Sequence, residues 1–483
     1  MLLDVAAAPY GLPIPSSSSS AAVEEVDDDA MIGQLAYFSN SPLNDSSNHS
    51  VAIVGIHGSG RDACAMFHRL MTTVKKHGCD GVGSNDTIDN KIDDEDLTTY
   101  TEQDNFLVIT PWFLCPADDC PPPPSLHGNS TRSLPYLRWI DDPVGSLQIE
   151  HSFRYGAESI PPINNNDVIA DDDTTMNNNA TVSSYFVMDV LLETLCNRSK
   201  YPNLSKIIIV GHSAGGQLVH RWGLMSGSWC FGNDDTNVGC LTKTDNDITA
   251  STKDDIANYS MPSIRLVVAN PRSFTYLDRR RYLPNTPTTS ANNNNDDHNQ
   301  DSIALEFRLP TISEVDECPY YNRYMWGIED NPDLPAPYIT KNIERLMKTV
   351  KHSDCASSVT TVEEALFCRY ASRDVVYLAG ENDTQIVEEQ ISCGDGYQGQ
   401  MRRDRSERYY ASLQHIGKEI LSRQRQDVTM GKDEEWSRFI TRFHSSHVDG
   451  EEIRIHRRLV VKDVGHEGGR MWKSDEGRIG MFD

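Results

Sequence analysis

The chain has 483 residues, which at roughly 100–200 residues per domain allows several domains or one large domain with long insertions. Its 44 Lys and Arg residues stand against 71 Asp and Glu residues, and the net charge of -27 disfavours nucleic acids and anionic membrane surfaces as partners. No window approaches the roughly 18 consecutive apolar residues of a membrane-spanning helix, so we expect no membrane span.

Polar, low-complexity stretches divide the chain. Residues 1–47 contain a serine run and an acidic run, and such a segment has too few apolar residues to order itself, so we predict a disordered tail. Four similar acidic or Asn-rich stretches follow, at about 80–104, 163–182, 233–258 and 285–302. Long surface loops cost little free energy, and we therefore expect one domain over 48–483 that carries them as disordered insertions.

Two kinds of patterned segment alternate between these stretches. Short β-branched runs typical of buried strands lie at 51–56, 106–110, 206–210, 264–269, 375–379 and 459–462. Helical patterns lie at 61–76, 184–197, 214–225 and 402–423. Apolar strands that alternate with helices predict an α/β fold, with a doubly wound, mostly parallel sheet covered by helices on both faces.

The first of these strands ends in a glycine-rich turn, His57-Gly58-Ser59-Gly60. Gly58 and Gly60 allow the backbone to approach a ligand closely, and an exposed N–H at such a turn can bind a developing oxyanion. Ser59 is our candidate for that N–H. The alternative is an ordinary turn capped by Asp62.

The strand at 206–210 leads into Gly211-His-Ser-Ala-Gly215, which a helical run follows. This is the context that a nucleophile elbow requires, with Ser213 on a tight turn and Gly211 and Gly215 removing side chains that would clash. The amide of Ala214, at the helix start, is the second candidate oxyanion donor. An ordinary glycine-rich turn between strand and helix is the alternative.

A serine nucleophile needs a base, and the base needs an acid to orient it. Asp383 follows the strand at 375–379, and Glu381 is the nearby alternative acid. His466 lies between glycines after the last strand and is the best candidate base. The competing histidines, His444 and His447, follow a helical stretch in a polar segment.

These four segments, in this order and each after a strand, resemble the α/β-hydrolase superfamily on its esterase and lipase side. The resemblance spans residues 51–472 and implies a Ser213–His466–Asp383 triad that cleaves small ester or acyl substrates without a cofactor. One departure is the spacing between Ser213 and Asp383, which is much longer than one strand and one helix.

The long connection 272–360 would, in such a fold, form a cap over the strand ends. Its candidate pocket walls, which plain packing would explain equally well, are Phe274, Tyr276, Tyr320, Tyr321, Tyr324 and Trp326.

Several alternatives stay open. The same residues suit an amide or peptide hydrolase, an acyltransferase, or a non-catalytic binding protein on this scaffold.

The sequence contains no H-E-x-x-H motif and no CxxC pair, so we expect no metal centre. The N-terminal sequence makes a poor signal peptide. Asn-x-Ser/Thr acceptors would suit secretion, and the compartment stays open; they include Asn44, Asn48, Asn129, Asn197, Asn203 and Asn258.

Overall fold

The computed structural model describes residues 10–15, 31–43, 48–80, 105–118, 135–140, 152–160, 181–227, 261–284, 305–330, 337–352, 361–384, 386, 392–428 and 455–483. Its main sheet has eight strands: β1 (Tyr10–Pro15), β2 (Met31–Ser39), β3 (Val51–Ile56), β4 (Phe106–Trp112), β5 (Lys206–His212), β6 (Ser263–Ala269), β9 (Asp374–Gly380) and β10 (Arg457–Val461). Their spatial order is β1-β2-β4-β3-β5-β6-β9-β10. β2 is antiparallel to both of its neighbours, and all the other pairs are parallel.

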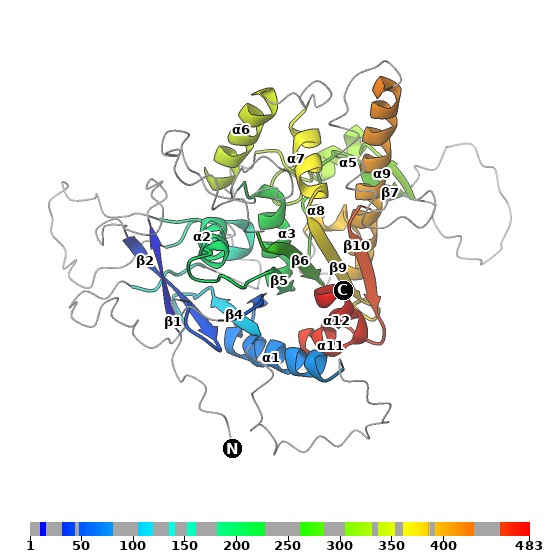
Figure 1. The fold of residues 1–483 in the computed structure, drawn as a ribbon. Helices are drawn as coiled ribbons and strands as arrows, with labels where there is room; N and C mark the ends of the chain where they lie inside the picture. Colours follow the sequence, from blue (N-terminus) through cyan, green and yellow to red (C-terminus); the bar gives the residue numbers. More distant parts are fainter. Residues whose placement is uncertain are drawn as a thin grey trace, which may run out of the picture.

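Helices cover both faces of this sheet (Figure 1). One face carries α2 (Ser184–Cys196), α3 (Ala214–Met225), α7 (Val362–Ala371) and α9 (Arg402–Val428), together with the short η4 (Phe153–Tyr155). The other carries α1 (Ala63–Asp80), α11 (Gly468–Lys473) and α12 (Asp475–Phe482). The predicted doubly wound α/β fold is therefore confirmed.

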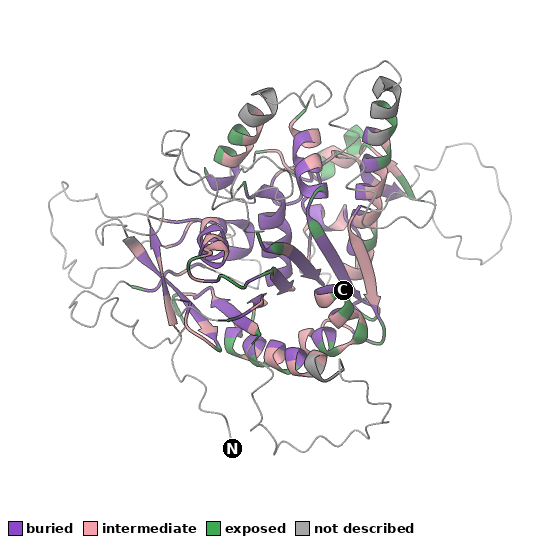
Figure 2. Cartoon of the chain, in the orientation of Figure 1, coloured by how far each residue is buried: buried purple, intermediate pink, exposed green. Residues whose placement is uncertain are grey.

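The strand β5 shows why the sheet is a two-sided core. Ile207 and Ile209 belong to the cluster under α2 and α3, whereas Ile208 and Val210 belong to the cluster under α1 and α11. Successive side chains of a strand point to opposite faces, so a continuous apolar run is what a strand buried on both faces needs. Figure 2 shows this burial along the central strands, while β10, at the edge, is only partly buried.

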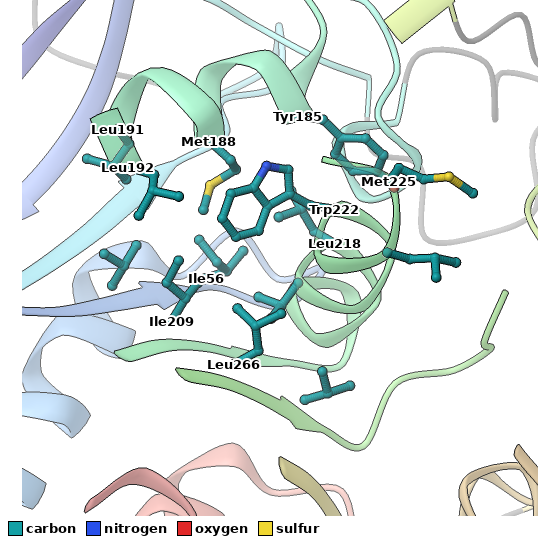
Figure 3. Close-up of a cluster of buried hydrophobic side chains, with 14 of the residues drawn as sticks. Ile56, Tyr185, Met188, Leu191, Leu192, Ile209, Leu218, Trp222, Met225 and Leu266 are labelled. Carbon is teal, nitrogen blue, oxygen red and sulfur yellow. The ribbon is translucent and has the colours of Figure 1, made fainter. Parts of the chain in front are cut away.

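Trp222 of α3 anchors the larger core cluster (Figure 3). It is fully buried between Met188 of α2 and the strand residues Ile56 and Ile209. Its indole N–H donates to the carboxylate of Asp189 at 2.8 Å, which satisfies the one polar atom that the ring brings into the core. This packing fixes the helix that follows the Gly211–Gly215 turn.

The prediction of a disordered tail over 1–47 is wrong for the two segments described there. β1 and β2 pair along their length and extend the sheet beyond β4. Leu12, Ile14 and Tyr37 are buried in the core, with Ile14 at 0% exposure. The composition of the whole stretch obscured two short apolar runs, which become stable only by pairing with a sheet formed from later residues.

The structure describes part of the predicted cap but almost none of the predicted polar insertions. The four polar stretches lie almost wholly outside the described residues. Within 272–360 the structure describes a hairpin of β7 (Arg281–Pro284) and β8 (Leu305–Arg308), then α5 (Ile312–Glu317) and α6 (Pro337–His352). That this connection caps the strand ends stays a prediction. Of its six aromatic side chains named above, all but Tyr320 are buried.

A disulfide joins this connection to a later helix. Cys318 is bonded to Cys393, the first residue of α8 (Cys393–Gly396), across a sequence separation of 75. Among the helices of the described segments, none is long and apolar enough to cross a membrane.

Candidate active site

Ser213 lies on a strained turn between β5 and α3. Its backbone has φ 56° and ψ -115°, a left-handed conformation that L-residues adopt only where the surroundings enforce it. A Cβ on Gly211 would come within 2.3 Å of the carbonyl oxygen of Gly215, and a Cβ on Gly215 within 2.2 Å of that of Ile56. Both positions therefore exclude any larger residue, which is the steric demand of a nucleophile elbow.

Three polar side chains from distant parts of the chain form one hydrogen-bonded line. The hydroxyl oxygen of Ser213 is 3.0 Å from Nε2 of His466, and Nδ1 of His466 is 2.9 Å from Oδ2 of Asp383. Asp383 follows β9, and His466 follows β10. Because the parallel strands all end at the same edge of the sheet, residues 253 positions apart meet there.

Asp383 is 1% exposed and lies beside two basic side chains, His466 and Arg402. Its Oδ2 contacts His466, and its Oδ1 lies 3.5 Å from Nη1 of Arg402 at the start of α9. Burial raises the pKa of this carboxyl, but the hydrogen bond and charge of His466 and the charge of Arg402 outweigh it, so the pKa is below its ordinary value. The carboxylate is therefore ionised at neutral pH.

Glu381, the alternative acid, has a different contact. Its Oε2 accepts a hydrogen bond from the backbone N–H of Asp463 at 3.1 Å, in the turn that precedes His466. Of the two carboxylates, Asp383 is thus the one hydrogen-bonded to the imidazole. The further candidate His444 and His447 lie outside the described residues.

The turn at 57–60 lies beside Ser213. A Cβ on Gly58 would be 3.7 Å from both the carbonyl oxygen of His212 and Cβ of Ser213. Nε2 of His57 accepts from the N–H of Phe113 at 3.0 Å, so its Nδ1–H donates to the carbonyl of Gly58 at 2.7 Å. This neutral, buried ring fixes the shape of the turn.

The roles of Ser59, Gly60 and Ala214 stay predictions. A Cβ on Gly60 would meet no atom within 4 Å, so the protein itself imposes no steric need for glycine there. Ala214 is the first residue of α3, and the N–H groups of a helix's first turn have no acceptor inside the helix. Such an N–H is suited to bind an anion beside Ser213.

Two residues at the site, Asn270 and His212, were not predicted from the sequence. Asn270, directly after β6, hydrogen-bonds the segments that carry Asp383 and His466. His212 has its ring centroid 4.8 Å from that of His466, and burial, with the charge of His466, lowers the pKa of His212 to about 3. A polar residue at the end of an apolar strand was the available signal for Asn270. Its partners could not be read from the sequence.

Another acidic residue of the sequence, Asp395, serves a separate cluster. It accepts from the indole of Trp326 and from Arg272, each at 2.9 Å. Within the segments that the structure describes, no group of three His, Cys, Asp or Glu side chains is arranged to hold a metal ion.

The chain matches no family model and no curated protein. Among solved structures it is similar to poly(aspartic acid) hydrolase-1 from Sphingomonas sp. KT-1, with 12% identity and a TM-score of 0.41 over 99% of this chain and 100% of that one. It is also similar to a poly(3-hydroxybutyrate) depolymerase from Bordetella parapertussis, with 12% identity and a TM-score of 0.38 over 96% and 88%. A siderophore hydrolase from Aspergillus nidulans follows at 9% identity and a TM-score of 0.28, over 97% and 91%.

These likenesses are too distant to bear on the reaction. The fold assignment rests on the sheet itself: the order β1-β2-β4-β3-β5-β6-β9-β10, with β2 antiparallel to its neighbours, is that of the α/β-hydrolase fold. A fold of this kind hosts many activities, so the chemistry has to be argued from the side chains.

Proposed function

We propose that this protein is a serine hydrolase that cleaves carboxylic esters through an acyl-enzyme intermediate. The observation that supports the proposal is the line from Ser213 through His466 to Asp383, with contacts of 3.0 Å and 2.9 Å. A serine on a strained turn, a base within hydrogen-bond distance and a buried acid behind the base together form the arrangement that activates a hydroxyl.

Each of the three side chains has a distinct task in the first half of the reaction. Nε2 of His466 takes the proton as the Ser213 oxygen attacks the carbonyl carbon, and the resulting imidazolium is stabilised by ionised Asp383. The same proton then passes to the leaving alcohol as the acyl-enzyme forms. Water, deprotonated in turn by His466, attacks the acyl-enzyme and releases the acid and free Ser213.

The negative charge that develops on the carbonyl oxygen needs donors. We assign them to the backbone N–H groups of Ala214 and Ser59, on the two turns that meet at Ser213. Loss of one such donor typically costs about 10²–10³ in kcat, so the pair would supply several kcal/mol of transition-state stabilisation. Asp383, with its pKa held below the ordinary value, stays ionised over the pH range in which this mechanism runs.

The test is Ser213→Ala, assayed with short-chain esters and with amides of the same acyl groups. We expect kcat on esters to fall by about 10⁴–10⁶ with little change in melting temperature, since one small oxygen is removed from a partly exposed turn. A fluorophosphonate should label the wild-type protein at Ser213, and mass spectrometry of the labelled peptide identifies the position. If amides were turned over faster than the matched esters, we would assign an amide instead of an ester as the bond that the protein cleaves.

The matched control is Ser205→Ala. Ser205 directly precedes β5, at the end of the strand opposite Ser213. It hydrogen-bonds the backbone carbonyl of Ser50. This variant should keep both labelling and turnover. A Ser213→Ala protein that retained more than a few per cent of wild-type activity on every ester would contradict the proposal.

A further inference from the structure

The end of β6 contacts all three segments of the candidate site. The carbonyl of Ala269 accepts from the N–H of Ser213 at 3.0 Å. The next residue, Asn270, uses both ends of its side-chain amide. Oδ1 accepts from the N–H of Gly380 at 2.8 Å, and Nδ2 donates to the carbonyl of Gly465 at 2.9 Å.

We propose that Asn270 is a positioning residue that sets the distance between Asp383 and His466, and thereby the alignment of the imidazole with Ser213. Gly380 ends the strand three residues before the acid, and Gly465 directly precedes the base. One planar amide bonds both backbones, so the distance between them can vary only as far as the lengths of its two hydrogen bonds allow. The inference rests on the proposed serine-hydrolase function.

The chemistry of this contact suits asparagine. The site needs one acceptor facing an N–H and one donor facing a carbonyl, and only one orientation of an amide satisfies both. Aspartate would place a second acceptor against the carbonyl of Gly465, and a small apolar residue would leave both backbone groups without this partner. Asn270 is 3% exposed, so each lost bond carries the cost of a buried, unsatisfied polar group.

The backbone at this point is also unusual. Asn270 has φ 41°, in the left-handed region, where asparagine is among the best tolerated residues other than glycine. Its N–H bonds the carbonyl of Leu378 at 3.0 Å, which adds a backbone contact to the same strand. A Cβ on Gly380 would approach the carbonyl oxygens of Gly465 and Val464 to 2.4 Å and 2.6 Å, so only glycine admits this close approach.

Other contacts also hold the turn that carries the base. Oε2 of Glu467 accepts from the N–H of Gly465 at 3.0 Å, and the N–H of Asn382 donates to the carbonyl of Val464 at 2.8 Å. Asn270 differs from these because it bonds the acid and base segments through a single side chain, and because its own backbone adjoins the contact to Ser213. We therefore expect its loss to affect catalysis more than folding.

The test uses Asn270→Asp, with Asn270→Gly as a second variant that removes the amide while permitting the left-handed φ. For both we expect kcat on an ester to fall about 10²-fold, the size associated with a misplacement of about 1 Å, with KM changed less than about threefold. The ratio of Asn270→Asp to wild-type kcat should rise as the pH is lowered, because a protonated carboxyl can again donate to Gly465. A purely structural role would not produce this partial recovery.

Asn40 provides a matched control. Its Nδ2 donates to the carbonyl of Phe106 and its Oδ1 accepts from the N–H of Val108, both at 2.9 Å, so its amide also makes one donor and one acceptor bond to backbone, but both bonds go to one strand, β4, from an exposed position. Asn40→Asp and Asn40→Gly should keep kcat within about twofold of wild type. Asn270 variants with wild-type kcat, or with losses no larger than the Asn40 variants show, would overturn the inference.

Amide hydrogen exchange separates this inference from the proposed function. Peptides covering 462–467 should exchange faster in Asn270→Asp than in wild type, whether or not an ester substrate is found. A wild-type protein that neither hydrolyses esters nor reacts with a fluorophosphonate would contradict the proposed function. Unchanged exchange of the 462–467 turn in both Asn270 variants would by itself contradict the positioning role.

Discussion

Asp383 combines contacts to two basic side chains with nearly complete burial. His466 contacts one carboxylate oxygen, and Arg402, which is itself partly exposed, lies near the other. Burial alone would favour the neutral acid, but the hydrogen bond from His466 and the nearby charge of Arg402 outweigh it, so the pKa of this carboxyl is below its ordinary value. An ionised carboxylate is what an orienting acid needs, since it must accept a hydrogen bond from Nδ1–H of His466, which leaves Nε2 without a proton and free to act as the base.

Substitution of the two carboxylates separates their roles. Asp383→Asn should lower kcat by about 10⁴ on any ester that the wild type cleaves, because an amide no longer favours the tautomer that accepts the Ser213 proton. Glu381→Gln should lower it far less, since the Glu381 carboxylate faces the N–H of Asp463. Steady-state kinetics of both variants on the same ester measure this. A crippled Glu381→Gln beside a near-normal Asp383→Asn would transfer the role to Glu381.

At the scale of elements, α3 is held at both of its ends. Its N-terminus directly follows the Ser213 turn. At its other end, backbone carbonyls of the last turn accept hydrogen bonds from two buried arginines: Arg369, in α7, and Arg373, two residues after α7 ends. Arg369 donates to Leu224 at 2.9 Å and to Met225 at 3.1 Å, and Arg373 donates to Gly223. Cations at a helix C-terminus complement its dipole and satisfy carbonyls that have no partner inside the helix. The helix that carries the nucleophile turn is thus a rigid support.

The edge strand β1 allows a direct test of how far the sheet extends. Ile14 is fully buried against the core, so Ile14→Ala should lower the free energy of unfolding by about 2–4 kcal/mol. Ile312, which is 83% exposed, is the matched control, and Ile312→Ala should stay within about 0.5 kcal/mol of wild type. Urea unfolding followed by circular dichroism measures both. Equal stability of the two variants would restore the interpretation of residues 10–15 as a disordered tail.

At the scale of the whole molecule, distant segments are joined by one covalent link as well as by the sheet. The disulfide between Cys318 and Cys393 connects the segment after α5 with α8, and Asp395 of α8 in turn bonds Trp326 and Arg272. These contacts tie the loop that follows β6 to the segment that leads into α9. The region beside the candidate site is therefore cross-linked by covalent and polar contacts together.

Removal of the disulfide should act on stability rather than on turnover. By the loop-entropy relation, a crosslink that closes about 75 residues stabilises the fold by up to about 4.5 kcal/mol. The Cys318→Ala/Cys393→Ala double variant should therefore unfold at a lower urea concentration, while kcat per folded molecule stays near wild type. Urea titrations with and without reductant provide the comparison. A wild-type midpoint that reductant leaves unchanged would contradict a bond between these two residues.

The sequence by itself determined the layers of the fold and the four segments that meet at the candidate site. β-branched runs, helical periodicity and the glycines around Ser213 are local signals, because strand burial and the sterics of a tight turn depend on adjacent residues. Asp383 and His466 were found from their place after strands, since parallel strands end at a common edge. Their catalytic roles, like those of Ser59 and Ala214, stay predictions that the experiments above decide.

Only the tertiary structure decided which groups face one another. Asp383 and Glu381 are two residues apart on one turn, and the hydrogen bond to His466 depends on how β9 and β10 align in space. Residues 1–47 as a whole looked too polar in composition to fold, but the two apolar runs within them, β1 and β2, are buried by pairing with each other and with β4, a strand later in the chain. The partners of Asn270, on segments 110 and 195 residues away, follow from the order of parallel strands in the sheet, which no local pattern encodes.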